Sequence, residues 1–432
     1  MTDVEWILEL LEQAGRAAGA MLLQPYYYAA VLFIALLVRR QVRTERRLFH
    51  VRLTMWPRVI GPSLAAGVAV GAAVSAAFLF LGIRLTADAV YWLWGASLLL
   101  LLLRIRWLGY VYAAGLLGIV QWALGFFERD AAPELFAKLE GSLADVDAGG
   151  LLLLAGVLQL AEAVLMRWRG SRQPGATFVE GKRGRPVGGY QLQSYWPVPL
   201  LLLVPGHADA ALPWVPLLWQ DGAPGSWGML GLPLILGLGA MTTSLLPQYK
   251  ARRMAGLLLW TGVGATAAGA GAALWEPLVP VAAIVAPILH EIIHFMERRR
   301  EEESSPLYVH DDRGLRVLAV TPDTPASQLG VEPGEILHKV NGFRVRTMED
   351  LYNGLLVNSA FSKLEVYNLE GQIKFLQRAR FEGEHHQLGF VFAPDEATLR
   401  LTEGAPASLL DLLRRGSKSR KREAGREHPV ST

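Results

Sequence analysis

The residues LVPVAAIVAPILHEIIHF occupy positions 278–295 and are followed by MERRREEESSP at positions 296–306. A membrane-spanning helix needs about 20 predominantly apolar residues, and arginines such as Arg298, Arg299 and Arg300 commonly flank one on its cytoplasmic side. The apolar run therefore predicts a final membrane span. From Leu307 onward the composition is that of a soluble α/β domain, so this stretch divides the chain into a membrane part and a soluble part.

Long apolar runs dominate the chain before this point. The protein has 432 residues, of which 52% are hydrophobic and 19% charged, and it contains no cysteine, which excludes disulfide and thiol chemistry. Hydropathy predicts a polytopic α-helical membrane bundle of about nine spans in a lipid bilayer. The predicted spans are residues 21–38, 59–83, 87–103, 107–127, 149–166, 198–218, 227–246, 255–274 and 278–295. The span at 198–218 is the weakest, because Pro205, Gly206 and Pro213 interrupt it. The alternatives to a full span there are a broken helix, a re-entrant segment or a segment partly outside the membrane.

Basic loops alternate with neutral or acidic loops along these spans. Arginines crowd residues 39–58 and 167–185, whereas residues 128–147 are acidic. Because loops rich in Lys and Arg stay in the cytoplasm, the alternation predicts an N-terminus outside the cell and a cytoplasmic soluble part. The net charge of +3 reflects these loops. The sequence has no basic patch interleaved with aromatic residues, so nucleic-acid binding is not predicted.

The chain is expected to have five parts. These are an amphipathic N-terminal segment at 1–20, the bundle at 21–298, a linker at 299–306, the soluble domain at 307–395 and a basic tail at 396–432. The polar composition of the tail predicts disorder.

Three motifs in the soluble part resemble those of bacterial PDZ domains. They are VTPDTPA at 320–326, GVEPGEIL at 330–337 and VNG at 340–342. The resemblance implies a small, β-rich α/β domain, in which Thr347 is placed to cap a helix at 348–357. QLGF at 387–390 resembles the carboxylate-binding loop of the family and stands at the end of the domain, as in its permuted bacterial form.

This resemblance implies that a peptide or a protein C-terminus binds by strand addition. Its expected contacts are Leu388, Gly389, Phe390, Val391 and Phe392. The helix at 348–357 would form the opposite wall, with Leu351 and Leu355 lining a pocket. The alternative is that these two leucines belong to the domain core.

His290, Glu291 and His294 form an HEIIH motif inside the last apolar run. In zincins, two histidines at this spacing bind zinc and the glutamate is the general base, and Glu162 is the best candidate for a further ligand. The motif resembles that of site-2 proteases, which also carry PDZ modules. In that family, however, the motif comes early and a later LDG-type motif supplies an aspartate ligand, and neither feature is present here. The alternative, which we expect, is a structural polar cluster of these four side chains with no cofactor and no enzymatic activity.

Further segments resemble one family of multi-span proteins that end in a permuted PDZ domain. They are QPYYY at 24–28, LFH at 48–50 and KRGRPVGGYQL at 182–192. With the architecture, they resemble the MinJ family of division-site topology determinants of Gram-positive rods. The resemblance implies a membrane adaptor at cell poles and division septa that bridges a DivIVA-like polar scaffold and a MinD-like division inhibitor. It does not imply which residues bind these partners.

Overall fold

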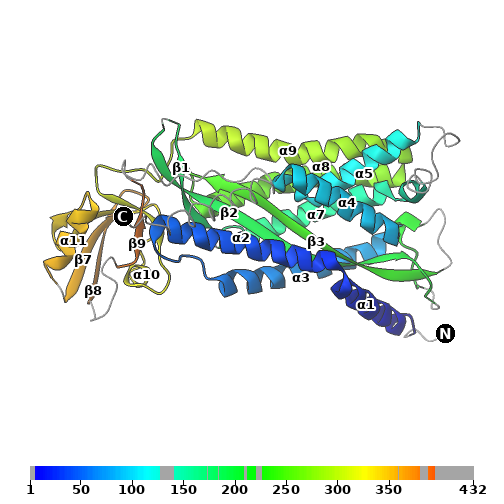
Figure 1. Cartoon of the computed structure of the whole chain (residues 1–432), viewed down its shortest axis with the longest axis horizontal. Coiled ribbons are helices and arrows are strands. Elements are labelled where there is room, and N and C mark those ends of the chain that lie inside the picture. The colour runs from blue at the N-terminus through cyan, green and yellow to red at the C-terminus, as the bar shows by residue number, and fades with distance from the viewer. Residues whose placement is uncertain are drawn as a thin grey trace, which may run out of the picture.

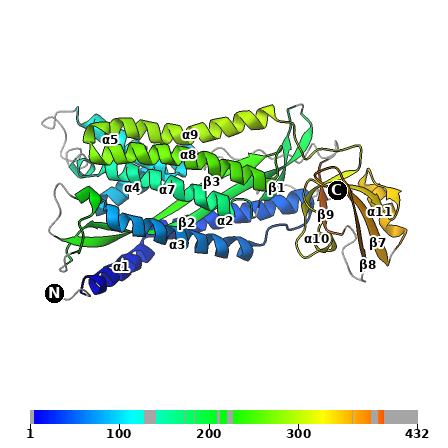
Figure 2. The same cartoon turned by 180° about the vertical axis from the view of Figure 1, so that it is seen from behind.

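The computed structural model describes residues 5–126, 141–172, 174–182, 184–208, 212–219, 226–358, 360–379 and 388–394. These residues form an elongated, mainly helical body with a β-rich domain at one end (Figure 1). The first helix lies at the other end of the body, as the view from behind also shows (Figure 2). The predicted basic tail at 396–432 lies outside the described residues.

The body contains long apolar helices. Within the described ranges its α-helices are α1 (Glu5–Leu23), α2 (Pro25–Phe49), α3 (Trp56–Leu81), α4 (Ala87–Leu103), α5 (Tyr110–Leu124), α7 (Ala148–Arg169), α8 (Pro247–Leu274) and α9 (Val279–Glu303). Short 3-10 turns are η1 (Ile105–Leu108), η3 (Leu217–Trp219) and η4 (Glu276–Leu278). Four of the helices, α3, α7, α8 and α9, are long and apolar enough to cross a membrane, and α1 with α2 makes a fifth span if this pair, bent by 60°, is counted as one. The prediction of a helical membrane region is confirmed at this level.

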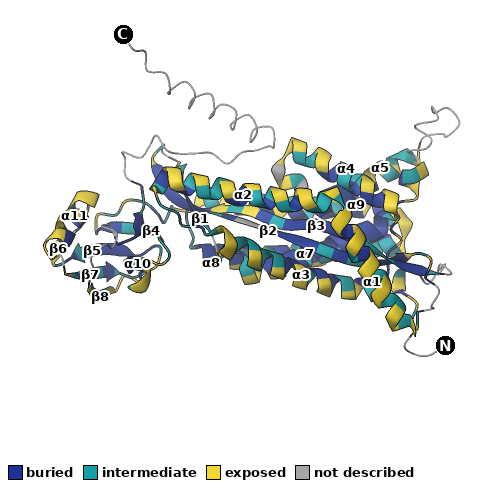
Figure 3. Ribbon diagram, turned by 60° about the horizontal axis from the view of Figure 1, so that its bottom comes forward, coloured by how far each residue is buried: buried dark blue, intermediate teal, exposed yellow. Residues whose placement is uncertain are grey.

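Helix α7 lies inside the body, and most of its residues are buried (Figure 3). Small residues let α8 approach it closely. A methyl group added at Gly156 would overlap the backbone of Thr266, and one added at Gly269 would overlap the backbone of Leu153. Because lipid removes the hydrophobic drive for helices to associate, such close contacts between small residues hold membrane helices together.

Two of the nine predicted spans are not helices. The strands that replace them, with a third short strand, are β1 (Gly175–Glu180), β2 (Pro186–Pro205) and β3 (Trp227–Thr242). The sheet has the antiparallel order β1-β2-β3, so the prediction of helical spans is wrong at 227–246 and in the first part of 198–218, where residues 198–205 belong to β2. Proline is one physical reason, since Pro197, Pro199 and Pro233 would each cost about 3 kcal/mol inside a helix. Hydropathy alone cannot distinguish a buried apolar strand from a buried helix.

The hairpin of β2 and β3 runs along the body among the helices (Figure 1). Since lipid offers no hydrogen-bond partners, the outer edges of these strands must be satisfied within the protein. Pro199 faces Pro233 across the hairpin. Because proline has no backbone N–H, neither residue leaves an amide donor without a partner. Two residues further along β2, the Leu201 amide donates to the Ser75 hydroxyl of α3 at 2.8 Å. On β3, the Gly231 carbonyl accepts a hydrogen bond from the Gln24 side chain at 3.2 Å.

The C-terminal domain is β-rich, as the sequence predicts. Its elements are β4 (Leu315–Val320), α10 (Pro325–Gln328), β5 (Ile336–Val340), β6 (Phe343–Arg344), α11 (Met348–Leu356), β7 (Phe361–Tyr367), β8 (Ile373–Ala379) and β9 (Phe390–Phe392). The sheet order is β8-β7-β5-β4-β9, and β6 pairs with β5. Thr347 begins α11 with a capping box to Asp350, which confirms the predicted helix start.

This domain packs directly against the end of the body. Tyr308 is fully buried there, and its carbonyl accepts a hydrogen bond from the Gly188 amide of β2 at 2.8 Å. The Leu307 amide donates to the Thr243 carbonyl at 2.7 Å. Helix α9 continues to Glu303, so much of the predicted linker at 299–306 is helical. One apolar cluster joins the two parts, with the buried members Leu48, Ala176, Phe178, Tyr190, Tyr308, Leu318, Ala319 and Val391.

Candidate functional site

The predicted peptide-binding residues come together at one side of the sheet, but most of them are buried. Leu388 and Phe390 belong to the core of the domain, in the same cluster as Leu351 and Leu355 of α11. Leu351 is 0% exposed and Leu355 is 3% exposed, so the structure assigns both leucines to the core and corrects their prediction as pocket lining.

The other two predicted contacts lie on β9. Val391 is buried in the apolar cluster that joins the domain to the body, whereas Phe392 is only partly buried and packs against the domain core. The side chains of β9 are thus divided between the domain core and the contact with the body. A ligand on this strand would depend on backbone groups, as strand addition requires.

Helix α11 presents a different apolar surface to solvent. Met348, Tyr352 and Leu356 are each exposed and recur every four residues, which places them on one side of the helix. We call these three residues the α11 stripe. The spacing of four is visible in the sequence, but it does not distinguish the stripe from the core, because Leu351 and Leu355 are as apolar as the stripe itself.

The turn before β9 is fixed by backbone hydrogen bonds. The Leu388 carbonyl accepts from the Ala326 amide at 2.8 Å, and the Gly389 carbonyl accepts from the Thr321 amide at 2.9 Å. Gly389 has φ +90°, and a side chain there would overlap Thr324. Glycine is therefore required for the conformation of this turn, beyond any approach of a ligand.

Gly389→Val is consequently expected to destabilise the whole domain. The added side chain meets both an unfavourable φ and the Thr324 side chain, and strain of this kind costs about 1–3 kcal/mol for each effect. Thermal unfolding of full-length protein in detergent measures the loss. Gly342→Val is a matched control, because Gly342 also has positive φ but no atom within 4 Å of an added Cβ. Equal losses in the two variants would contradict a packing role for Gly389.

The HEIIH motif lies on α9 and faces the turn between α4 and α5. The Glu291 carboxylate accepts hydrogen bonds from Trp107 Nε1 and from the Tyr112 hydroxyl, each at 3.0 Å, and forms an ion pair with Arg106 at 2.9 Å. The expected contact of Glu291 with Glu162 and the histidines is therefore corrected, since its partners come from η1 and α5.

Of the other members of the expected cluster, the two histidines contact each other, whereas Glu162 has a hydrogen-bond partner on β3. The His290 ring packs edge-on against Tyr112 and against His294, with ring centroids 5.4 and 5.7 Å apart. Glu162 of α7 is buried, and the Gly237 amide of β3 donates a hydrogen bond to it. Across the described ranges, no group of three or more His, Cys, Asp or Glu residues is placed to hold a metal ion.

A buried ion-pair network joins α8 and α9 beneath the C-terminal domain. Lys250 is paired with Glu297 at 2.7 Å and with Glu301 at 3.1 Å, and Arg253 is paired with Glu297 at 3.1 Å. Glu301 also accepts hydrogen bonds from the Ser244 amide at 2.9 Å and from the backbone and hydroxyl of Thr243. The network therefore fixes the ends of β3, α8 and α9 where the domain docks.

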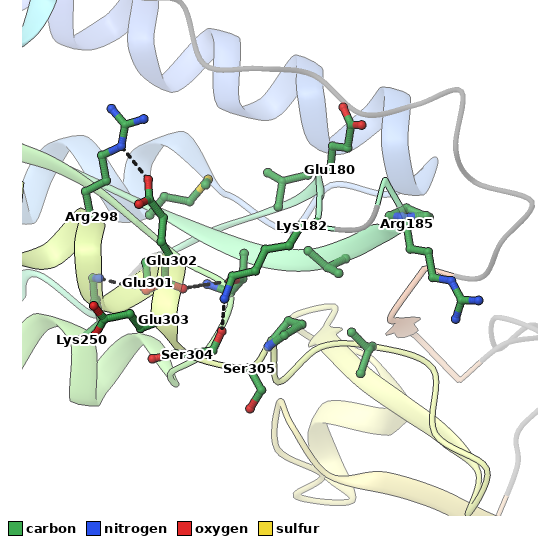
Figure 4. A pocket seen from close by; sticks show the side chains of 18 of the residues that line it. Glu180, Lys182, Arg185, Lys250, Arg298, Glu301, Glu302, Glu303, Ser304 and Ser305 are labelled. Carbon is green, nitrogen blue, oxygen red and sulfur yellow. Dashed lines mark hydrogen bonds and ion pairs between the residues drawn. The ribbon is translucent and has the colours of Figure 1, made fainter.

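Beside this network lies a cleft of about 1320 Å³ between the body and the domain (Figure 4). It is lined by the β1–β2 turn, the end of α9, the following connection and the start of the domain. Lys182 crosses part of it and donates a hydrogen bond to the Ser304 carbonyl at 3.2 Å. Polar and charged side chains that line this junction cleft include Glu180, Lys182, Arg298, Glu302, Glu303 and Asp312.

Comparison with known proteins identifies relatives along almost the entire chain. The cell division topological determinant MinJ of Bacillus subtilis (strain 168) is 29% identical over 407 residues, which cover 91% of this chain and 97% of that protein. Probable cell division topological determinants MinJ of Lacticaseibacillus paracasei and Lacticaseibacillus casei (strain BD-II) are each 26% identical over 393 residues, covering 87% of this chain and 98% of each relative. No protein-family model matches the chain.

Proposed function

Because this chain is a MinJ-like protein with a role in the topology of cell division, we propose that it is a membrane scaffold that recruits other division proteins. On this proposal it bridges a DivIVA-like polar scaffold and a MinD-like inhibitor at cell poles and septa. The observation that carries the proposal is the similarity to division topology determinants across 91% of the chain, which includes both the apolar body and the β-rich domain.

The contact between body and domain supports a scaffolding role. A domain on a free tether would sample many orientations, whereas this one is held by a shared apolar cluster and by backbone hydrogen bonds to β2 and β3. A partner bound to the domain would therefore be held at a defined place relative to the membrane. We propose an N-terminus outside the cell and the domain in the cytoplasm, with the β2–β3 hairpin crossing the membrane inside the helices.

We further propose that the domain binds an extended peptide in the PDZ manner, between β9 and α11. The α11 stripe of Met348, Tyr352 and Leu356 supports this, since it offers apolar side chains that Leu351 and Leu355, as core residues, do not. Strand addition supplies affinity through backbone hydrogen bonds, and exposed side chains beside the strand supply specificity. Aromatic residues often contribute most to such contacts, which makes Tyr352 the first residue to test.

Tyr352→Glu is expected to weaken recruitment of cytoplasmic division proteins by about tenfold or more, because it places a charge in an apolar contact. Full-length protein with a C-terminal fluorescent fusion is followed at septa and poles, and co-purified partners are quantified. Fluorescence of the fusion also tests the cytoplasmic orientation. Phe375→Glu is the control, since Phe375 is 66% exposed and lies on β8, at the edge of the sheet opposite β9. Equal recruitment by both variants would rule out the α11 stripe as the partner site.

We propose that the HEIIH motif has a structural role and that the protein is not an enzyme. Glu291→Ala is expected to cost about 1–3 kcal/mol, because Trp107 and Tyr112 lose their acceptor. Glu291→Gln keeps an acceptor oxygen for both donors and is expected to lose only the contribution of Arg106, about 1 kcal/mol or less. Thermal unfolding measures both. Stoichiometric zinc in the purified protein, with substrate cleavage abolished equally by both variants, would instead support a metalloprotease.

A further inference from the structure

The junction cleft is too large to be explained by one small ligand. Small-molecule sites usually measure about 300–1,000 Å³, whereas this cleft has about 1320 Å³. Its walls come from the body, from the end of α9 and from the C-terminal domain (Figure 4). An elongated occupant would therefore touch all three parts and hold the domain in its docked position.

The charges that line the cleft are acidic on balance and favour a basic occupant, because six carboxylates outnumber four cations. The carboxylates are Glu180, Glu297, Glu301, Glu302, Glu303 and Asp312, and the cations are Lys182, Arg185, Lys250 and Arg298. Lys250 forms ion pairs with Glu297 and Glu301, and Arg298 forms one with Glu302 at 2.8 Å. Three further lining carboxylates, Glu180, Glu303 and Asp312, are solvent-exposed, and none of them forms an ion pair with a Lys or Arg in the part of the chain that the structure describes. We call these three residues the cleft carboxylates.

The chain itself carries a matching segment at the edge of the cleft. Pro394 is the last described residue of the domain, and it lines the cleft. Beyond it, residues 414–426 contain seven Lys or Arg and one Glu. The intervening residues 395–413 can span up to about 60 Å at ~3.3 Å per residue. A segment tethered so close to its site has a high effective concentration, so weak individual contacts suffice for binding.

We propose that the basic segment at 414–426 binds in the junction cleft of its own chain, against the cleft carboxylates. This inference does not depend on the proposed division function. Bound there, the segment fastens the C-terminal domain to the body. Because the cleft carboxylates are exposed, the binding is sensitive to ionic strength. A competing basic ligand, or an anionic membrane surface that attracts the segment, releases it.

The absence of cysteine from the chain allows a direct test in the full-length protein. Ser305→Cys places a thiol in the cleft lining and Ser419→Cys places one among the basic residues, and neither change removes a charge. A protease site inserted between residues 395 and 413 reveals cross-linking, because the tail stays attached after cleavage only when a short bis-maleimide has joined the two thiols. The control pair combines Ser419→Cys with Ser327→Cys, which is exposed on α10 outside the cleft.

In membranes at low salt, the cleft pair is expected to retain the tail about tenfold more efficiently than the control pair. Raising the salt to about 0.5 M should remove most of this difference. Glu180→Gln with Asp312→Asn should lower the yield, whereas Glu349→Gln with Glu370→Gln, outside the cleft, should leave it unchanged. Equal yields from the two cysteine pairs, cross-links formed only between chains, or a yield unaffected by the cleft carboxylates would overturn the proposal.

Discussion

Gly67→Ala is expected to lower the stability of the membrane body by about 3 kcal/mol, near the upper end of the usual cost of overpacking. Gly67 lies on α3 against β2, and the added methyl group would overlap the carbonyl oxygen of Pro197. A methyl group added at Gly71, one turn later, would likewise overlap the carbonyl oxygen of Pro199. Because a backbone oxygen cannot rotate away as a side chain can, α3 must move off the strand, which would also break the Ser75 contact with Leu201.

Gly61→Ala provides the matched control in the same helix. No atom lies within 4 Å of an added Cβ at Gly61, so this change should be neutral or should stabilise the helix by about 0.5–1 kcal/mol. Thermal unfolding in detergent and the amount of protein in the membrane measure both variants. If Gly67→Ala is as stable as Gly61→Ala, the hairpin does not pack against α3 as described.

The contrast between α3 and the hairpin shows how far hydropathy predicts this fold. The apolar runs at 59–83 and 149–166 become α3 and α7, because nothing in them opposes a helix except Pro62 near the start of α3. Residues 198–205 and most of the run at 227–246 are also strongly apolar but belong to β2 and β3. The prolines were visible in the sequence. The hydrogen-bond partners that satisfy the outer edges of these strands include Ser75 and Gln24. They lie far from the strands in the sequence, so no local pattern identifies them.

The candidate site shows the same limit in its side chains. The motifs of the C-terminal domain correctly predict that it is β-rich and that Thr347 caps a helix, because turns and caps depend on neighbouring residues. Whether Leu351 lines a pocket or fills the core depends on what packs around it, and its apolar cluster includes Leu388 and Phe390, which follow it by 37 and 39 positions. The acceptor role of Glu291 toward Trp107 likewise arises from a contact across 184 positions.

Lys250→Met is expected to be the most damaging change at the junction, with a loss of about 3–5 kcal/mol, as for a buried ion pair that loses one partner. The Lys250 side chain is 3% exposed and lies between two carboxylates. Without it, Glu297 keeps its ion pair with Arg253, and Glu301 keeps its hydrogen bonds from Thr243 and Ser244. The methionine fills similar space but leaves an uncompensated negative charge in the interior.

Arg298→Met is the matched control, because it removes another cation that lines the cleft, and the pair of Arg298 with Glu302 is exposed at both ends. Its expected cost is about 1 kcal/mol or less. Glu301 binds the Thr243–Ser244 turn, and the Thr243 carbonyl in turn accepts a hydrogen bond from the Leu307 amide. Lys250→Met should therefore also loosen the attachment of the C-terminal domain to the body. Limited proteolysis at residues 304–306 should therefore accelerate in Lys250→Met but not in Arg298→Met. Equal proteolysis and equal melting temperatures in the two variants would show that the buried network does not hold the domain in place.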